Sequence, residues 1–196
     1  EKNTIGSGTT AKSAGTHCLI DDSVAHEFWD VRLFGFNFYT GLEKAMPGSA
    51  AFEKTGTLTV APYKEYETYV MKAVSLTLAS GYHAEYWHDP AKIHSVIPDI
   101  NVEGLLGAGW CPDDGFFDAT MISNTLARLA REMGAQIHIG TKVDGVTMAG
   151  GKVTGLDTSK GHFDFDLVVD ATGPWARYTA RQVGLELPIW HTKAEV

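Results

Sequence analysis

The chain has 196 residues, of which 44% are hydrophobic and 20% are charged, and its formal net charge is -8. This composition is typical of a globular protein, and without a basic stripe nucleic-acid binding is not expected. No run of about 18 apolar residues predicts a membrane span, and no signal peptide is recognisable, so we expect a cytoplasmic protein. The two cysteines, Cys18 and Cys111, form no CxxC pattern and are expected to be reduced thiols.

The first part of the chain is expected to be a loop followed by a long helix. Gly, Ser and Thr dominate residues 5–15, which is typical of a loop. A helix is predicted over 21–46, with Asp21 and Asp22 at its start and Pro47-Gly48 at its end. Apolar residues at helical spacing predict one face of this helix, made of Val24, Phe28, Val31, Phe38, Leu42 and Ala45.

The middle of the chain alternates between short strands and helices. Asp89 suits the N-cap of a short helix, and Pro90 suits its first position. Gly81 suits the end of the helix before it. The predicted elements are a strand at 55–61, a helix at 63–79 with Tyr66, Val70, Ala73 and Thr77 on one face, a strand at 83–88, the short helix after Asp89, a strand at 105–110 and a turn at 112–115.

The last part mixes helices with a hairpin. Leu167-Val168-Val169 is fully apolar, as expected of a buried parallel strand. The predicted elements are a helix at 118–133 capped by Gly134, a strand at 135–143, a hairpin of 146–148 and 152–157 around 149–151, a strand at 163–171, a helix at 174–183 and the start of a strand at 190–196. This order predicts an α/β chain with crossover helices and an antiparallel section.

Two segments resemble ligand-binding loops. Gly6-Ser7-Gly8-Thr9-Thr10-Ala11 matches G-x-G-x-x-A, but no buried strand precedes it, so we do not interpret it as a dinucleotide fingerprint. Asp170 to Trp175 joins a predicted strand to a predicted helix through Gly173. That junction has two interpretations, a ligand site at the carboxyl end of a strand or an ordinary turn. His83, His88 and His94 lack metal-ligand spacing and are interpreted as scattered histidines.

Three stretches together resemble the D-amino-acid oxidase superfamily, which includes glycine oxidase, sarcosine oxidase and dimethylglycine dehydrogenase. They are EKNTIGSGTTAKSAG, then GWCPDDGFFDATMISNTLARLAREMGAQIHIGTKVDGV, and finally LVVDATGPWA. They follow the family's order over nearly the full chain. The resemblance implies an FAD-dependent enzyme that oxidises a C–N bond of an amino acid or N-methylated amine by hydride transfer to the flavin.

The resemblance also implies which residues contact the cofactor. Glu1 would accept a hydrogen bond from the adenosine ribose, and Lys2 would lie near the adenine. Val143 would contact the adenine through its backbone. The remaining positions would face the pyrophosphate (Thr9, Thr10), the isoalloxazine (Ser13, Ala14, Gly15) and the phosphate side of the flavin (Ala171, Thr172, Gly173).

Some family features differ or are absent here. Lys12 stands where some dehydrogenases carry a flavin-linking His, and neither His17 nor Cys18 is expected to replace it, so FAD is expected to bind non-covalently. The chain contains no GxGxxG loop, which in the family lies just before the position of Glu1, and neither end is expected to be a natural terminus. No Arg is assigned to the substrate carboxylate. Five arginines are interpreted as helix-surface charges: Arg32, Arg128, Arg131, Arg177 and Arg181.

The resemblance implies two interwoven lobes. Residues 1–46 and 118–187 would form part of a Rossmann-like FAD-binding lobe, and residues 47–117 and 188–196 part of an antiparallel substrate-binding lobe. The implied partners are a small amine or amino acid and the remaining segments of the same polypeptide or other subunits. The alternative is a fragment or subunit that does not bind FAD alone and acts as an interaction module that completes a site with partner chains.

Overall fold

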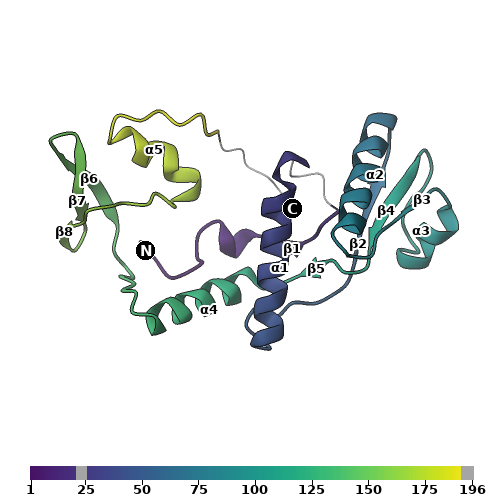
Figure 1. The fold of residues 1–196 in the computed structure, drawn as a ribbon, viewed down its shortest axis with the longest axis horizontal. Coiled ribbons are helices and arrows are strands. Elements are labelled where there is room, and N and C mark those ends of the chain that lie inside the picture. The colour runs from purple at the N-terminus through teal and green to yellow at the C-terminus, as the bar shows by residue number, and fades with distance from the viewer. Residues whose placement is uncertain (21–25, 191–196) are drawn as a thin grey trace. The chain divides into compact units, whose positions relative to one another are not determined.

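The computed structural model describes residues 1–20 and 26–190, and these form two compact units (Figure 1). One unit is Gly8–Leu126, and the other combines Glu1–Ser7 with Ala127–Val196. The predicted mixture of helices and antiparallel sheet is confirmed, and every strand pair among the described residues is antiparallel. Within those residues no helix is both long and apolar enough to cross a membrane.

A three-stranded sheet forms the centre of the Gly8–Leu126 unit. Its order is β2 (Thr57–Ala61), β4 (Gly107–Cys111) and β3 (Glu85–Trp87). Side chains alternate between the two faces of a strand. Cys111 therefore packs into a cluster with α2 (Lys64–Ala79), whereas Ala108 packs with Trp87 and with Ile93 of α3 (Pro90–Val96). Gly109 lies under α2, where an added Cβ would come within 2.7 Å of Val70.

Helices α2 and α3 confirm two sequence predictions. The predicted face of α2 is the buried one, because Val70, Ala73 and Thr77 are buried and Tyr66 packs against the same cluster. Helix α3 begins as its sequence predicts: the Asp89 carboxylate accepts a hydrogen bond from the Ala91 amide at 2.9 Å, and Pro90 occupies the first turn. Local signals sufficed here because capping and periodicity are short-range.

The predicted apolar face of α1 (Trp29–Ala45) is wrong. Phe28 and Phe38 are exposed and the side chain of Val31 is 69% accessible, whereas Phe36 is the buried residue. The ring of Phe36 stacks on His17 and meets Tyr82 edge-on. Apolar residues lie on several sides of this helix, so their spacing alone could not select the packed side. Val24, Asp21 and Asp22 fall outside the described residues.

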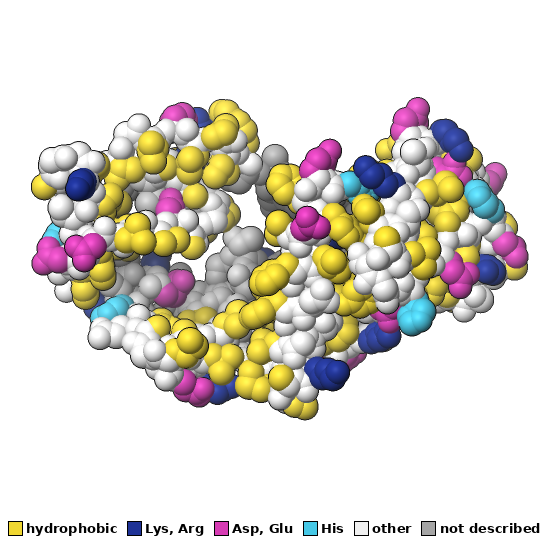
Figure 2. All heavy atoms as spheres, in the orientation of Figure 1, with side chains coloured by type: hydrophobic (Ala, Val, Ile, Leu, Met, Phe, Trp, Pro, Cys, Tyr) yellow, Lys and Arg dark blue, Asp and Glu magenta, His cyan; other side chains and the backbone are white. Residues whose placement is uncertain are grey.

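Hydrophobic side chains are therefore visible on the surface over α1 (Figure 2). They belong to Phe28, Val31, Phe34 and Phe38, and the rings of Phe34 and Phe38 stack with centroids 6.2 Å apart.

Helix α4 (Ala119–Glu132) follows later in the chain and confirms the helix predicted over 118–133. The Asp118 carboxylate accepts a hydrogen bond from the Met121 amide at 2.8 Å at its first turn.

The second unit contains the predicted hairpin. β6 (Val143–Ala149) pairs with β7 (Lys152–Thr158), and Gly150 and Gly151 between them have φ of 58° and 76°. Two successive positive φ angles are the signature of the tight turns that glycine favours. β8 (Gly161–Asp164) extends the sheet in the order β6-β7-β8.

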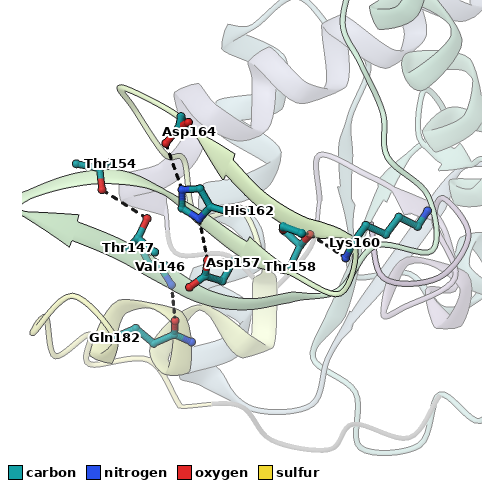
Figure 3. Close-up of polar contacts among 10 residues, drawn as sticks. Val146, Thr147, Thr154, Asp157, Thr158, Lys160, His162, Asp164 and Gln182 are labelled. Atoms are coloured by element: carbon teal, nitrogen blue, oxygen red, sulfur yellow. Dashed lines mark hydrogen bonds and ion pairs between the residues drawn. The ribbon is translucent and has the colours of Figure 1, made fainter.

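Polar side chains connect this sheet across its strands (Figure 3). His162 lies directly opposite Asp157, and its two ring nitrogens contact Asp157 at 2.7 Å and Asp164 at 3.2 Å. The hydrogen bond to Asp157, followed by that to Asp164, raises the pKa of His162. The Gln182 side chain accepts a hydrogen bond from the Val146 amide at 3.0 Å. This bond joins the sheet to the segment after α5 (Ala176–Arg181).

Two predicted strands are wrong. Residues 135–142 form no strand, and after β8 the segment 165–172 forms none either, so the Leu167 and Val169 side chains are each 79% accessible. A strand requires a hydrogen-bonded neighbour. The backbone of 138–141 forms three hydrogen bonds with Glu1 and Asn3, which do not extend into a strand pair. Among the described residues, no strand pairs with 167–169. The helix predicted over 174–183 is shorter, formed by a 3₁₀ turn (Gly173–Trp175) and α5. Residues 191–196 lie outside the described residues.

Candidate functional site

The glycine- and threonine-rich loop is an irregular segment with one 3₁₀ turn, Thr10–Lys12. Thr9 and Thr10 accept backbone bonds from Lys12 and Ser13 at 3.0 and 3.1 Å, and the Ser13 hydroxyl accepts one from the Gly15 amide at 3.1 Å. The amides that open a helical turn have no partner within it. The loop therefore offers N–H donors at the positions predicted to face a pyrophosphate, while the side chains of Thr9, Ser13 and Ala14 remain exposed.

Gly15 ends this loop and is tightly enclosed. Its φ is +69°, and an added Cβ would lie 2.1 Å from the carbonyl oxygen of Phe117. The Phe117 amide donates to the Gly15 carbonyl at 2.9 Å. The next residues form β1 (Thr16–His17), which pairs with β5 (Gly115–Phe116). Only a glycine fits at this junction.

His17 is a packing residue in this structure. Its ring is stacked on Phe36 with centroids 4.5 Å apart, and Tyr39, Phe52 and Phe117 surround it. Nε2 contacts the Phe36 carbonyl at 3.1 Å, so this nitrogen carries the donated proton. Burial lowers the pKa of His17, which favours the neutral ring. An apolar cleft of about 250 Å³ adjoins this residue and the start of α1.

Arg32 lines the same cleft. The interpretation of Arg32 as a helix-surface charge is therefore wrong. The Arg32 Nη1 donates to the Leu19 carbonyl at 3.1 Å. Arg177 and Arg181 instead bind the Glu186 carboxylate, and these two bonds lower the pKa of Glu186 to about 2. Arg128 forms an ion pair with Glu132 one helical turn later.

Sequence reasoning missed Asp114, which was assigned only to a turn. Its side chain is fully buried, and its carboxylate oxygens accept hydrogen bonds from the amides of Leu19 at 2.8 Å and Ile20 at 3.4 Å. Burial raises the pKa of Asp114 to about 6 in spite of those bonds. Burial, followed by the negative charge of Asp114, raises the pKa of the neighbouring Cys111 thiol to about 12. The sequence signal that could have pointed to Asp114 is a pair of adjacent carboxylates in a turn that follows an apolar strand.

Glu1 lies in the other unit, beside the segment that leads to β6. Its amino group donates to the His138 carbonyl at 2.9 Å, and its carbonyl accepts from the Thr141 amide at 2.9 Å. The Glu1 carboxylate accepts a bond from the Asn3 amide at 3.0 Å and otherwise stays exposed with Lys2. Val143 follows Thr141 by two residues, so the structure brings the predicted ribose acceptor close to the predicted adenine contact.

The junction before α5 is open on the side of Gly173. Gly173 has a φ of +60°, and an added Cβ would meet no atom within 4 Å. Thr172 is held by Asp170, whose carboxylate accepts bonds from its amide at 3.0 Å and its hydroxyl at 2.7 Å. Ala171, Thr172 and Gly173 are all exposed. This geometry leaves room for a ligand to approach the backbone closely.

These features suit the parts of a flavin dinucleotide. An exposed carboxylate suits a ribose hydroxyl, helical-turn amides suit phosphate, and an open glycine suits close contact with the ligand. The predicted residues divide between the units. The Gly8–Leu126 unit holds Thr9, Thr10, Ser13, Ala14 and Gly15. The other unit holds Glu1, Lys2, Val143, Ala171, Thr172 and Gly173.

The three histidines considered as a metal set bond to three different protein groups. His83 contacts Asp113 at 2.9 Å, His88 the Leu106 carbonyl at 3.1 Å, and His94 the Ile100 carbonyl at 3.2 Å. Over the described ranges, no group of three or more metal-ligating side chains is present. Cys18 and Cys111 are both unbridged.

Residues 1–196 match the protein family described as FAD dependent oxidoreductase, and the chain belongs to this family. The resemblance found in the sequence is thereby confirmed. The residues assigned to the cofactor, and the two lobes, stay predictions.

Curated relatives of the chain include an oxidase and a dehydrogenase. The chain is 28% identical over 190 residues to 4-methylaminobutanoate oxidase (formaldehyde-forming) of Paenarthrobacter nicotinovorans, covering 97% of the chain and 23% of the relative. It is 25% identical over 194 residues to mitochondrial dimethylglycine dehydrogenase of Homo sapiens, covering 96% and 22%. The chain therefore spans less than a quarter of the length of these relatives.

Solved structures share the fold. L-proline dehydrogenase from P. horikoshii superimposes with a TM-score of 0.78 at 23% identity, covering 94% of this chain and 48% of that one. Glycine oxidase from Geobacillus kaustophilus gives 0.77 at 24% identity, covering 95% and 51%. The chain spans about half the length of these structures.

Proposed function

We propose that the full-length protein containing this chain oxidises a C–N bond in a small amino acid or N-methylated amine, with FAD bound non-covalently. The family match over residues 1–196 carries this proposal. Relatives named as an oxidase of 4-methylaminobutanoate and a dehydrogenase of dimethylglycine support the amine substrate class. A cytoplasmic location stays a prediction from composition.

The residues of this chain would bind and orient the cofactor. FAD supplies two-electron redox chemistry when bound. The Glu1 carboxylate would accept a ribose hydroxyl, and the amides at Thr9 and Thr10 would donate to the pyrophosphate. Gly15 would hold the loop end beside the flavin ring. The exposed backbone of Ala171 to Gly173 would lie along the phosphate side.

A substrate screen on the full-length protein tests the reaction class. We expect at least one amine to bleach the oxidised flavin absorbance under anaerobic conditions, because C–N oxidation delivers two electrons to the cofactor. The panel is D-amino acids, glycine, sarcosine, dimethylglycine, proline and 4-methylaminobutanoate. The 2-hydroxy analogues of the same acids are the control. Bleaching by the hydroxy acids but by none of the amines would contradict the proposal.

A second candidate is an interaction module that completes a site with partner chains. One observation favours it: the chain is 26% identical over 181 residues to a mitochondrial protein of Mus musculus named pyruvate dehydrogenase phosphatase regulatory subunit, covering 90% of the chain and 20% of the relative. That relative is named as a regulatory subunit, not as an oxidase. A full-length protein that holds no flavin and is not reduced by amines would favour this candidate.

The 196-residue chain by itself is expected to retain no FAD. Backbone amides of a GxGxxG loop and the following helix provide much of the grip on a pyrophosphate, and this sequence contains no such loop. The test is gel filtration of the purified chain after incubation with FAD, with the full-length protein treated in parallel. Coelution of yellow colour with the 196-residue chain would contradict the prediction.

A further inference from the structure

The buried carboxylate of Asp114 forms a link between two segments of the Gly8–Leu126 unit. It stands at the turn between β4 and β5 and accepts the amides of Leu19 and Ile20 at 2.8 and 3.4 Å. Leu19, Ile20 and Asp114 are each 0% accessible. Buried amides need acceptors, so this carboxylate fixes the backbone that follows β1.

The residues after Asp114 hold the backbone just before that point. Gly115 pairs with His17, and Phe116 pairs with Thr16. The Phe117 amide then donates to the Gly15 carbonyl at 2.9 Å. One continuous stretch, 114–117, therefore contacts the backbone of 15–20 in register. Its first contact is made by the Asp114 side chain.

The neighbouring carboxylate of Asp113 provides a natural contrast. It binds the Lys54 ammonium, the His83 amide at 2.8 Å and the His83 ring at 2.9 Å. None of these partners lies in residues 13–20. The two aspartates share one turn and one side-chain chemistry, but they hold different segments.

We propose that Asp114 is a positioning residue that sets the conformation of the loop ending at Ser13, Ala14 and Gly15, and through it the placement of that loop against the flavin ring. This inference rests on the proposed function for the identity of the ligand. The loop geometry itself does not depend on it. No other side-chain carboxylate in the described residues accepts the Leu19 and Ile20 amides.

The chemistry of the link can be removed with little change of shape. In Asp114→Asn, one oxygen can still accept an amide, but the NH₂ group would face the second amide donor. That buried amide would lose its acceptor, and the backbone would shift to find another. In Asp113→Asn, the same change occurs at partners outside the loop.

The test compares Asp114→Asn with Asp113→Asn in the full-length protein. In Asp114→Asn, amide hydrogen exchange at residues 13–20 should be faster than in wild type. In Asp113→Asn, exchange at the same residues should equal that of wild type. We also expect shifted visible bands of the bound flavin and a fall in kcat of about 10- to 100-fold in Asp114→Asn, because a small misplacement of reacting groups costs that much. KM should change little.

The readouts separate the possible failures. Unchanged exchange at residues 13–20 in Asp114→Asn would overturn the inference, whether or not the protein holds flavin. A wild-type protein without flavin would count against the proposed function, and the exchange result would still decide the role of Asp114. If Asp114→Asn does not fold, exchange in wild type decides: protected Leu19 and Ile20 amides support the link, and exchange as fast as in loop 7–9 overturns it.

Discussion

Replacing Gly15 with alanine should destabilise the Gly8–Leu126 unit by about 2–4 kcal/mol, since both a positive φ and a steric overlap are involved. Gly15 has a φ of +69°, and the new Cβ would lie 2.1 Å from the Phe117 carbonyl oxygen. Backbone atoms cannot rotate away as a side chain can, so β1 and β5 would have to separate. The full-length variant should also lose flavin, because the loop predicted to face the ring ends at this residue.

Gly8→Ala is the matched control in the same loop. An added Cβ at Gly8 would meet nothing within 4 Å, and its φ is not in the left-handed region. Urea unfolding of the full-length protein and its flavin content after dialysis measure both effects. If Gly15→Ala matches Gly8→Ala in both stability and flavin content, the β1–β5 junction is not required for stability or for flavin binding, and the prediction is wrong.

Replacing Gly173 with valine should strongly weaken flavin binding by the full-length protein. The space beside Gly173 is open within 4 Å, as close approach of a ligand to the backbone requires, and its φ is +60°. A β-branched side chain would fill that space and resist the backbone conformation. We expect FAD binding to weaken by more than about tenfold, the equivalent of about 1.4 kcal/mol.

Gly184→Val is the control that separates the effect of blocking the ligand at Gly173 from the effect of backbone strain. Gly184 lies in the same unit, has a φ of +77°, and also has no atom within 4 Å of an added Cβ. It therefore experiences the same strain without adjoining a predicted cofactor residue. FAD titration of the apoproteins of both variants gives the comparison. Equal affinities in the two variants would remove Gly173 from the site.

The sequence could predict elements whose signals are local. The α2 face, the Asp89 cap of α3 and the hairpin at Gly150-Gly151 all follow from contacts within a few residues, and the structure confirms them. Strands that need distant partners could not be placed in this way. Residues 135–142 and 167–169 have strand-like sequences, but among the described residues they lack the neighbours that would form a ladder.

Helix α1 shows a different difficulty. Its apolar residues outnumber the positions that one packed face can hold, so the pattern could not distinguish Phe36 from Phe38. Phe36 packs against His17, a residue of β1, and β1 is held by its pairing with β5. Tertiary contacts of that kind are not visible in helical periodicity.

The candidate site came from the resemblance and not from spacing. Nothing in the sequence itself distinguishes Glu1 from another acidic residue, and its position beside Thr141 became visible only in the structure. Asp114 was missed because a turn aspartate is usually solvated, and only burial shows that it holds two amides. Gly15 and Gly173 were both placed at ligand-facing positions, and the structure gives each a positive φ.

We expect FAD to bind the full-length protein through the residues of this chain that are assigned to the cofactor. The most direct measurement is an experimental structure of the full-length protein purified with FAD. We predict that the isoalloxazine ring lies against Ser13 to Gly15, that the ribose contacts Glu1 and that the phosphate side of the flavin contacts Gly173. A bound flavin that leaves Ser13 to Gly15 or Gly173 without contact would contradict the prediction.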